Sequence, residues 1–252
     1  MARQGGKGAG GKAGGARGDG MGRRAAVRVR TAGKRSASST QWLERQLNDP
    51  YVGEARQRGL RSRAAFKLMQ LDDRFHLLRR GQRIVDLGCA PGGWLQVAVE
   101  RTKPVPGKGY IVGIDILLTE PVAGATVIAL DFLDEAAPAR LKEALGGEAD
   151  LVMSDMAAPT TGHRATDHLR VVALAETAYA FAASILAPGG AFLAKVFQGG
   201  AERDLLAQLK RDFATVRHAK PAASRAESAE IYVVAQGFRG LSPEDRSCPD
   251  QN

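Results

Sequence analysis

The 252-residue sequence has few cysteines, few aromatic residues and no long apolar run. Aromatic residues make up 6% of the chain, and its two cysteines, Cys89 and Cys248, have neither zinc-ligand spacing nor a partner framework for disulfides. No apolar run approaches the roughly 18–20 residues that span a bilayer. The basic N-terminus lacks the apolar core of a secretory signal. We therefore expect a cytoplasmic protein that binds neither a membrane nor a metal.

Acidic residues are almost absent from the first 35 positions. This segment holds ten of the 36 Lys/Arg residues, eleven of the 30 glycines and a single acid, Asp19. The formal charge of +9 therefore lies entirely in residues 1–35. Such a segment buries too little apolar surface to offset its ordering entropy, which predicts a disordered basic arm over residues 1–40 and a flexible tail over 241–252. A cationic arm suits RNA or another polyanion, and a merely solubilising tail would have the same composition.

Between these ends, apolar runs of strand length alternate with helical patterns. The predicted strands are 83–87, 110–114, 126–130, 150–154, 191–197 and 231–236. The predicted helices are 62–76, 93–101, 135–145, 167–187 and 201–212. This alternation indicates an α/β domain over residues 41–240, with a parallel sheet and helices on both of its faces.

The turn after the first predicted strand narrows the function most. Residues 84–94 read IVDLGCAPGGW, which is typical of a strand, a tight Gly-rich loop and the start of a helix. Such a loop brings a nucleotide-like ligand against bare backbone, where a side chain would hold the ligand away. Ala90 breaks the dinucleotide pattern G-x-G-x-x-G, and Trp94 would crowd a pyrophosphate. A nicotinamide-dependent dehydrogenase and a purely structural turn stay open as alternatives.

Four consecutive predicted strands each end in an aspartate: Asp86, Asp115, Asp131 and Asp155. Ligands of open parallel sheets bind beyond the carboxyl ends of the strands, so these acids are expected at one edge. Asp115 lies about 20 residues past the Gly-rich loop, where a carboxylate commonly accepts from ribose hydroxyls. Asp131 is placed to accept from an adenine amine. An acidic rim also suits a cationic ligand, which favours S-adenosylmethionine over NAD.

Three charged residues interrupt patterns that are otherwise apolar. Lys195 lies in the run GAFLAKVF, and a buried lysine is rare unless it is paired. Because burial disfavours the charged amine, Lys195 could serve as a general base; a lysine with its head in water is the alternative. Lys67 lies within the helical pattern AAFKLM, and Glu230 opens the last predicted strand. Each of these two alone is more often a surface residue.

Taken together, these segments resemble the FtsJ/RlmE family of S-adenosylmethionine-dependent ribose 2′-O-methyltransferases. The matching segments run in family order over about residues 41–238: SRAAFKL at 62–68, DLGCAPGGW at 86–94, SDMA at 154–157, APGG at 187–190, KVFQG at 195–199 and KPAASRAESAEIY at 220–232. The resemblance implies a Rossmann-like class I methyltransferase fold with a mostly parallel seven-stranded sheet. It also implies a monomer that methylates a uridine of 23S ribosomal RNA in the assembled 50S subunit during ribosome biogenesis.

The resemblance also assigns site residues, motif by motif. It places a catalytic set on Lys67, Asp155, Lys195 and Glu230. It places contacts with S-adenosylmethionine on Gly92, Trp94, Asp115, Asp131 and Asp155. Methylation of tRNA or another RNA, and a non-catalytic role as an RNA-binding assembly protein, stay open.

A basic stretch precedes and enters the first predicted helix. It consists of Arg56, Arg58, Arg61, Arg63 and Lys67. Because it adjoins the proposed site, we expect it to contact RNA phosphates and to make binding depend steeply on salt.

Overall fold

The computed structural model describes residue 1 and residues 36–105, 110–158, 161–199 and 202–240. The chain divides into two compact units, Met1–Asn48 and Asp49–Asn252. The first unit contains helix α1 (Ala37–Leu47), which Ser36 caps by accepting from the backbone N–H of Ser39. Helix α1 crosses the predicted boundary at residue 40, whereas the rest of the predicted arm and the tail lie outside the described residues. No helix in the described ranges has the length and apolarity to cross a membrane.

The second unit is built on a seven-stranded sheet with the strand order β3-β2-β1-β4-β5-β7-β6. Its strands are β1 (Ile84–Leu87), β2 (Ile111–Asp115), β3 (Thr126–Ala129), β4 (Ala149–Ser154), β5 (Leu186–Phe197), β6 (Phe213–Ala219) and β7 (Glu230–Phe238). Strands β1 to β5 are parallel, and β7 runs antiparallel to both β5 and β6. The predicted mostly parallel, seven-stranded α/β sheet is confirmed.

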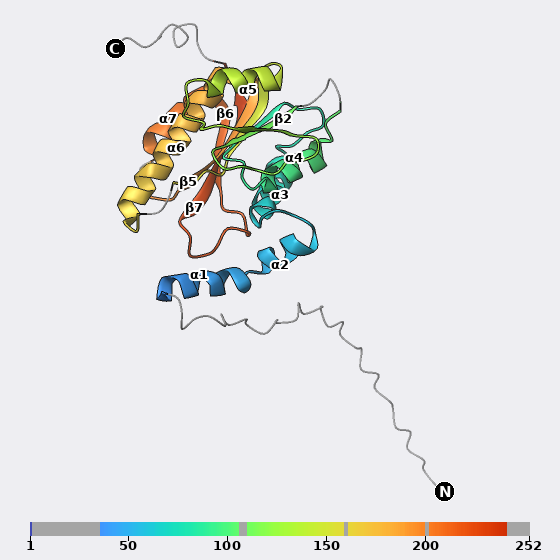
Figure 1. Ribbon diagram of the computed structural model, residues 1–252, viewed down its shortest axis with the longest axis vertical. Helices are drawn as coiled ribbons and strands as arrows, with labels where there is room; N and C mark the ends of the chain where they lie inside the picture. The colour runs from blue at the N-terminus through green and yellow to red at the C-terminus, as the bar shows by residue number, and fades with distance from the viewer. Residues whose placement is uncertain (2–35, 106–109, 159–160, 200–201, 241–252) are drawn as a thin grey trace. The chain divides into compact units, whose positions relative to one another are not determined.

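Helices cover both faces of this sheet (Figure 1). On one face lie α2 (Pro50–Gln57), α3 (Ala64–Phe75) and α4 (Gly93–Thr102), and on the other α5 (Ala137–Leu145), α6 (Arg164–Ile185) and α7 (Arg203–Asp212). Successive strand residues point to opposite faces. Within β1, Ile84 joins the core beneath α3 and α4, and Val85 and Leu87 join the core beneath α5. Coverage on both sides is why these strands read as continuous apolar runs.

The strand order switches between β1 and β4: β2 and β3 lie on one side of β1, and β4 and the later strands lie on the other. Strand β1 is paired with β2 on one side and with β4 on the other, and Leu87 lies level with both Ile114 and Ser154. The loops that follow these three strands therefore start at the same level of one edge. This is the switch point at which open α/β sheets bind their ligands.

Two strands differ from the sequence-based expectation. Strand β5 begins at Leu186 rather than at 191, and it includes residues 186 and 187, which were predicted as the end of a helix. Strand β6 was not predicted, because its residues FATVRHA lack a continuous apolar run. It lies at the sheet edge, where only its first and last residues are buried, so the pattern of a central strand is not required.

Candidate active site

Two glycines shape the Gly-rich loop (residues 88–92) between β1 and α4. Gly88 and Gly92 have φ angles of 76° and 101°, a region that favours glycine. A Cβ atom on Gly88 would lie 2.3 Å from the Cγ atom of Met156, and one on Gly92 would lie 2.8 Å from Nη1 of Arg61. The loop therefore packs closely against the segment after β4 and the segment before α3.

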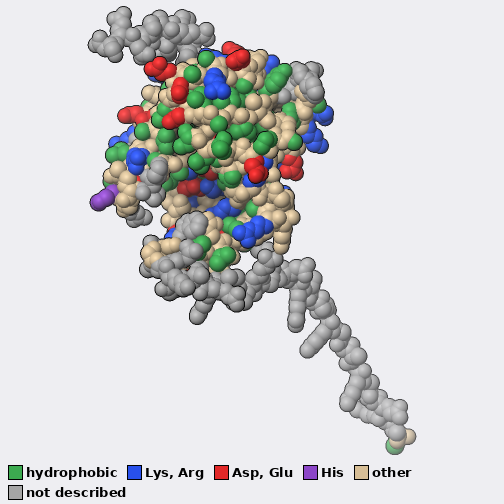
Figure 2. All heavy atoms as spheres, in the orientation of Figure 1, with side chains coloured by type: hydrophobic (Ala, Val, Ile, Leu, Met, Phe, Trp, Pro, Cys, Tyr) green, Lys and Arg blue, Asp and Glu red, His purple; other side chains and the backbone are tan. Residues whose placement is uncertain are grey.

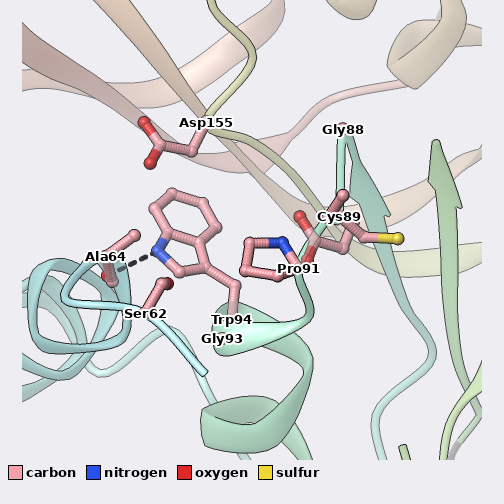
Figure 3. A pocket seen from close by; sticks show the side chains of 10 residues that line it. Ser62, Ala64, Gly88, Cys89, Pro91, Gly93, Trp94 and Asp155 are labelled. Carbon is pink, nitrogen blue, oxygen red and sulfur yellow. Dashed lines mark hydrogen bonds between the residues drawn. The ribbon is translucent and has the colours of Figure 1, made fainter. Parts of the chain in front are cut away.

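A pocket of about 140 Å³ lies beside this loop (Figure 3). Trp94, at the start of α4, forms part of its lining, and its indole Nε1 donates to the carbonyl oxygen of Ala64 at 2.8 Å. Figure 3 shows the indole ring between Asp155 and Ser62, and the sulfur of Cys89 pointing away from the ring. Burial, with help from nearby carboxyl groups, raises the pKa of the Cys89 thiol to about 12, so it stays protonated.

Two buried polar atoms that line this pocket have no hydrogen-bond partner among the described residues: Oγ of Ser62 and Oδ2 of Asp86. Asp86 is 1% exposed. Its pKa is raised well above the ordinary carboxyl value, chiefly by burial and further by the charges of Asp155 and Asp115. An unsatisfied buried polar group is costly, so these two atoms mark a place where a ligand with donor groups would be stabilised.

A larger pocket, of about 710 Å³, adjoins the first one and shares Gly88, Ala90 and Asp155 with it. Asp115 and Asp131 line this larger pocket. The two oxygens of Asp115 accept from the backbone N–H groups of Ala90 and Leu117, at 2.8 and 2.9 Å, and Oδ1 of Asp131 accepts from Leu133. Each carboxylate oxygen has a second lone pair. The pocket therefore offers free acceptors to hydroxyl or amine groups.

Beside both pockets, Lys67, Asp155, Lys195 and Glu230 come together from α3, the end of β4, β5 and β7. Nζ of Lys67 lies 2.8 Å from Oε1 of Glu230 and 3.5 Å from Oδ2 of Asp155. Nζ of Lys195 lies 3.1 Å from Oδ1 of Asp155 and donates to the backbone oxygen of the same residue at 2.7 Å. The four residues thus form one continuous chain of alternating charges.

The two lysines of this cluster are buried, with exposed fractions of 8% for Lys67 and 7% for Lys195. Burial opposes ionisation of Asp155, but the charges of Lys195 and Lys67 outweigh it and hold the pKa of this carboxyl below its ordinary value. Buried charges are tolerated when they are paired in this way. The expectation that Lys195 is a buried lysine with a partner is therefore met.

Residues 60–238 match the model of the family described as FtsJ-like methyltransferase. The chain belongs to this family. It is a methyltransferase, as the segments that resembled the FtsJ/RlmE family predicted.

Similar proteins extend over most of this FtsJ-like methyltransferase. "Ribosomal RNA large subunit methyltransferase E" from Rhodospirillum rubrum is 63% identical over 227 residues, which cover 90% of this chain and 86% of the relative. The protein of the same name from Bradyrhizobium diazoefficiens is 64% identical over 214 residues, covering 85% and 94% of the two chains. The crystal structure of a ribosomal RNA methyltransferase from Plasmodium falciparum is 34% identical, has a TM-score of 0.64, and matches 72% of this chain and all of that chain.

Four of the five residues predicted to contact the methyl donor line the two pockets. Trp94 and Asp155 line the smaller pocket, and Asp115, Asp131 and again Asp155 line the larger one. Gly92 belongs to neither lining; it caps α4 and packs against Arg61. Donor contacts at all five positions stay predictions.

Two hydroxyl groups complete the charged cluster, and sequence reasoning missed both. The hydroxyl of Tyr232 donates to Oδ1 of Asp155 at 2.6 Å, and that of Ser224 donates to Oε1 of Glu230 at 2.7 Å. Burial raises the pKa of Tyr232, and the charges of Asp155 and Glu230 raise it further, so the phenol remains a donor. A signal was available, because Tyr232 lies two residues after Glu230 and so shares its face of β7.

The predicted RNA-contacting arginines are largely engaged within the protein. Nη1 of Arg63 lies 2.9 Å from Oδ2 of Asp49, and the same guanidinium also donates to the carbonyl oxygen of Ala223. The guanidinium of Arg58 lies 5.3 Å from the ring centroid of Phe66. Arg61 donates to three backbone carbonyl groups. Contact between this stretch and RNA therefore stays a prediction, and the structure gives Arg58, Arg61 and Arg63 partners within the protein.

Proposed function

We propose that this enzyme transfers a methyl group from S-adenosylmethionine to the ribose 2′-hydroxyl of a uridine in 23S ribosomal RNA, with the assembled 50S subunit as substrate. The names of the relatives from Rhodospirillum rubrum and Bradyrhizobium diazoefficiens support the choice of large-subunit ribosomal RNA. The observation that carries the proposal is the buried cluster of Lys67, Asp155, Lys195 and Glu230, which adjoins two acid-lined pockets through Asp155, a lining residue of both.

The chemistry of the two pockets fits S-adenosylmethionine. When bound, this cofactor supplies a methyl group on a positively charged sulfonium. Asp115 and Asp131 offer carboxylate acceptors to ribose hydroxyls and to an adenine amine, and Asp86 offers an unpartnered oxygen in the smaller pocket. Carboxylates repel phosphates, so the same lining disfavours NAD. The alternative of a nicotinamide-dependent dehydrogenase therefore loses support.

Lys195 is the proposed base for the 2′-hydroxyl proton. Its Nζ is held by two oxygens of Asp155, a residue that lines both pockets, so the amine has a fixed position before substrate binds. As a general base, Lys195 would accept the hydroxyl proton while the ribose oxygen bonds to the methyl carbon and the bond from that carbon to sulfur breaks, which releases the donor as a neutral thioether.

Lys67 is the proposed stabiliser of the negative charge that develops on the ribose oxygen. It is held between Glu230 at 2.8 Å and Asp155 at 3.5 Å, so its ammonium group is positioned before substrate binds. A donor that is already in place costs no reorganisation during the reaction. Glu230, itself fixed by the hydroxyl of Ser224, orients Lys67.

RNA is expected to bind as a polyanion as well as through the target nucleotide. Lys/Arg and Asp/Glu side chains are interspersed over the described surface that Figure 2 shows. The formal excess of +9 belongs to residues 1–35, which we propose add affinity that does not depend on RNA sequence. We place the enzyme in the cytoplasm as a monomer, with the large ribosomal subunit as its partner.

Incubation with radiolabelled S-adenosylmethionine and either free 23S RNA, intact 50S subunits or bulk tRNA tests the proposal. We expect label on one uridine ribose, found after nuclease digestion, with intact subunits as the best substrate. The Lys195→Met variant is the matched control and should leave the RNA unlabelled. Label in tRNA alone would favour the alternative RNA substrate, and no label in any RNA would contradict the proposal.

A further inference from the structure

Arg61 connects two segments that contribute to the lining of the two pockets. Its guanidinium donates to the carbonyl oxygens of Pro91 at 3.2 Å, Glu120 at 2.6 Å and Pro121 at 2.7 Å. Pro91 belongs to the Gly-rich loop, which lines both pockets. Glu120 and Pro121 belong to the segment after β2, whose first residues, Ile116 and Leu117, line the larger pocket.

The position of Arg61 is itself fixed from α4. The backbone N–H of Arg61 donates to Oε1 of Gln96 at 2.8 Å, and Nε2 of Gln96 donates to the carbonyl oxygen of Gly59 at 3.1 Å. The guanidinium then passes over Gly92, where a Cβ atom would lie 2.8 Å from its Nη1. Both the backbone and the side chain of Arg61 are therefore held in place by surrounding groups.

We propose that Arg61 is a positioning residue for methyl-donor binding, which holds the Gly-rich loop and the segment after β2 at a fixed separation. The inference rests on the proposed function of the two pockets. Three acceptors from two segments require a planar group with several donors in fixed directions, which a guanidinium supplies and a lysine ammonium does not. The role differs from the RNA contact that the basic sequence around Arg61 suggested.

The effect of Arg61 should fall on donor binding rather than on the chemical step. The segment after β2 carries exposed apolar side chains, with Leu117 62% exposed, so few packing contacts hold it. Without the guanidinium, both segments must be ordered when the donor binds, which weakens affinity. Among the described residues, Arg61 makes no hydrogen bond to the cluster of Lys67, Asp155, Lys195 and Glu230.

The test compares Arg61→Lys with the wild-type protein. Lysine keeps the charge, so affinity for RNA and its salt dependence should stay unchanged. We expect the Kd for S-adenosylmethionine, measured by calorimetry, to rise about tenfold, with kcat at saturating donor close to the wild-type value. Arg101→Lys is the matched control, because Arg101 pairs with Asp72 and Asp73 at the far end of α4. Its donor Kd should not change.

The outcomes separate this inference from the proposed function. A wild-type protein that binds no S-adenosylmethionine would refute the proposed function. A wild-type protein that binds it, with an Arg61→Lys variant of equal affinity, would overturn the role of Arg61 alone. A variant with normal donor affinity and a raised KM for RNA would show that Arg61 acts on RNA.

A second variant keeps the inference testable if Arg61→Lys does not fold. Gln96→Ala leaves the guanidinium in place but releases the backbone of residues 59–61. We expect a smaller rise in donor Kd, again with kcat at saturating donor preserved. Unchanged donor affinity in a folded Gln96→Ala protein would then overturn the proposal.

Discussion

The two halves of the strand-end edge carry the same acidic side chains in different surroundings. At the ends of β1 and β2, Asp86 and Asp115 have no ion pair with a described residue, whereas Asp155 after β4 lies between two lysines. Burial opposes ionisation of both Asp86 and Asp155, yet the pKa of Asp86 is raised and that of Asp155 is lowered. Neighbouring cations, rather than burial, therefore decide which carboxyl group is ionised.

This difference matches the two tasks that we propose for the edge. The half with Asp86 and Asp115 is suited to a cationic ligand, because neither carboxyl group forms an ion pair with a described residue, although Arg170 also lines the larger pocket. The half with Lys67 and Lys195 is suited to proton transfer, because its charges balance before substrate arrives. Substitutions in one half should therefore leave the function of the other half largely intact.

The largest effect is expected for Lys195→Met, which removes the proposed base. We expect kcat to fall by about 10²–10⁴ or more, while the Kd for S-adenosylmethionine stays near its wild-type value. Single-turnover kinetics and calorimetry measure the two quantities. Lys142→Met, an exposed lysine of α5, is the control. Near-normal turnover of Lys195→Met would remove Lys195 from the mechanism.

Asp115→Ala should have the opposite result, with a large change in the Kd for S-adenosylmethionine and a small change in kcat. Loss of acceptors for the donor's hydroxyls, and of the bond to Ala90, should raise the Kd for S-adenosylmethionine about 10- to 100-fold. At saturating donor, kcat should change little. Asp134→Ala is a suitable control, because Asp134 accepts from the backbone of Ala136 outside the pocket linings. A loss confined to kcat would contradict the division between the two halves.

Tyr232→Phe removes one hydroxyl and keeps the ring. This hydroxyl donates to Oδ1 of Asp155 and helps the two lysines to hold the pKa of Asp155 below its ordinary value, so its loss should raise that pKa. We expect kcat to fall several-fold, about the effect of one charge-assisted hydrogen bond, and the pH–rate profile to move to higher pH. Tyr51→Phe should cause no such shift. An unchanged profile with wild-type kcat would show that Tyr232 only fills space.

The smallest effect is expected for Asp86→Asn, measured as stability against pH. Above the ordinary carboxyl pKa of about 3.9, the unfolded chain releases the Asp86 proton, whereas the folded protein keeps it until its raised pKa is reached. Asp86 therefore lowers the free energy of unfolding as pH rises through this window. Urea denaturation at several pH values should show the variant gaining stability relative to wild type. Parallel curves would mean that Asp86 titrates normally.

The sequence identified the sheet edge because its signals are local. A carboxylate that follows an apolar run, as Asp115 does, marks the end of a parallel strand wherever that strand lies in the sheet. Lys195 was conspicuous because a charge inside an apolar run is rare. Lys67 and Glu230 needed the family resemblance, because each of them taken alone is more often a surface residue.

What the sequence could not supply were contacts that depend on acceptors elsewhere in the fold. Arg61 lies in a basic stretch, which predicted RNA contact, but its partners are backbone carbonyl groups up to 60 positions away. Every residue has a backbone carbonyl group, so the sequence does not show which of them accept from Arg61. Tyr232 was missed for a related reason, because its acceptor, Asp155, lies 77 positions earlier in the chain. Ser224 lies only six positions before its acceptor, so its hydroxyl gains a role only once Glu230 has been assigned one.

The internal position of β7 also bears on when activity arises during synthesis. Strand β7 is the last strand in chain order, yet it lies between β5 and β6. A growing chain that has completed β5 must leave its edge open until residues 230–238 arrive, because that edge pairs with β7. Insertion of β7 also brings Glu230 next to Lys67, which is synthesised 163 positions earlier. If Glu230 has the role proposed for it, the nascent protein gains a complete active site only when β7 has inserted.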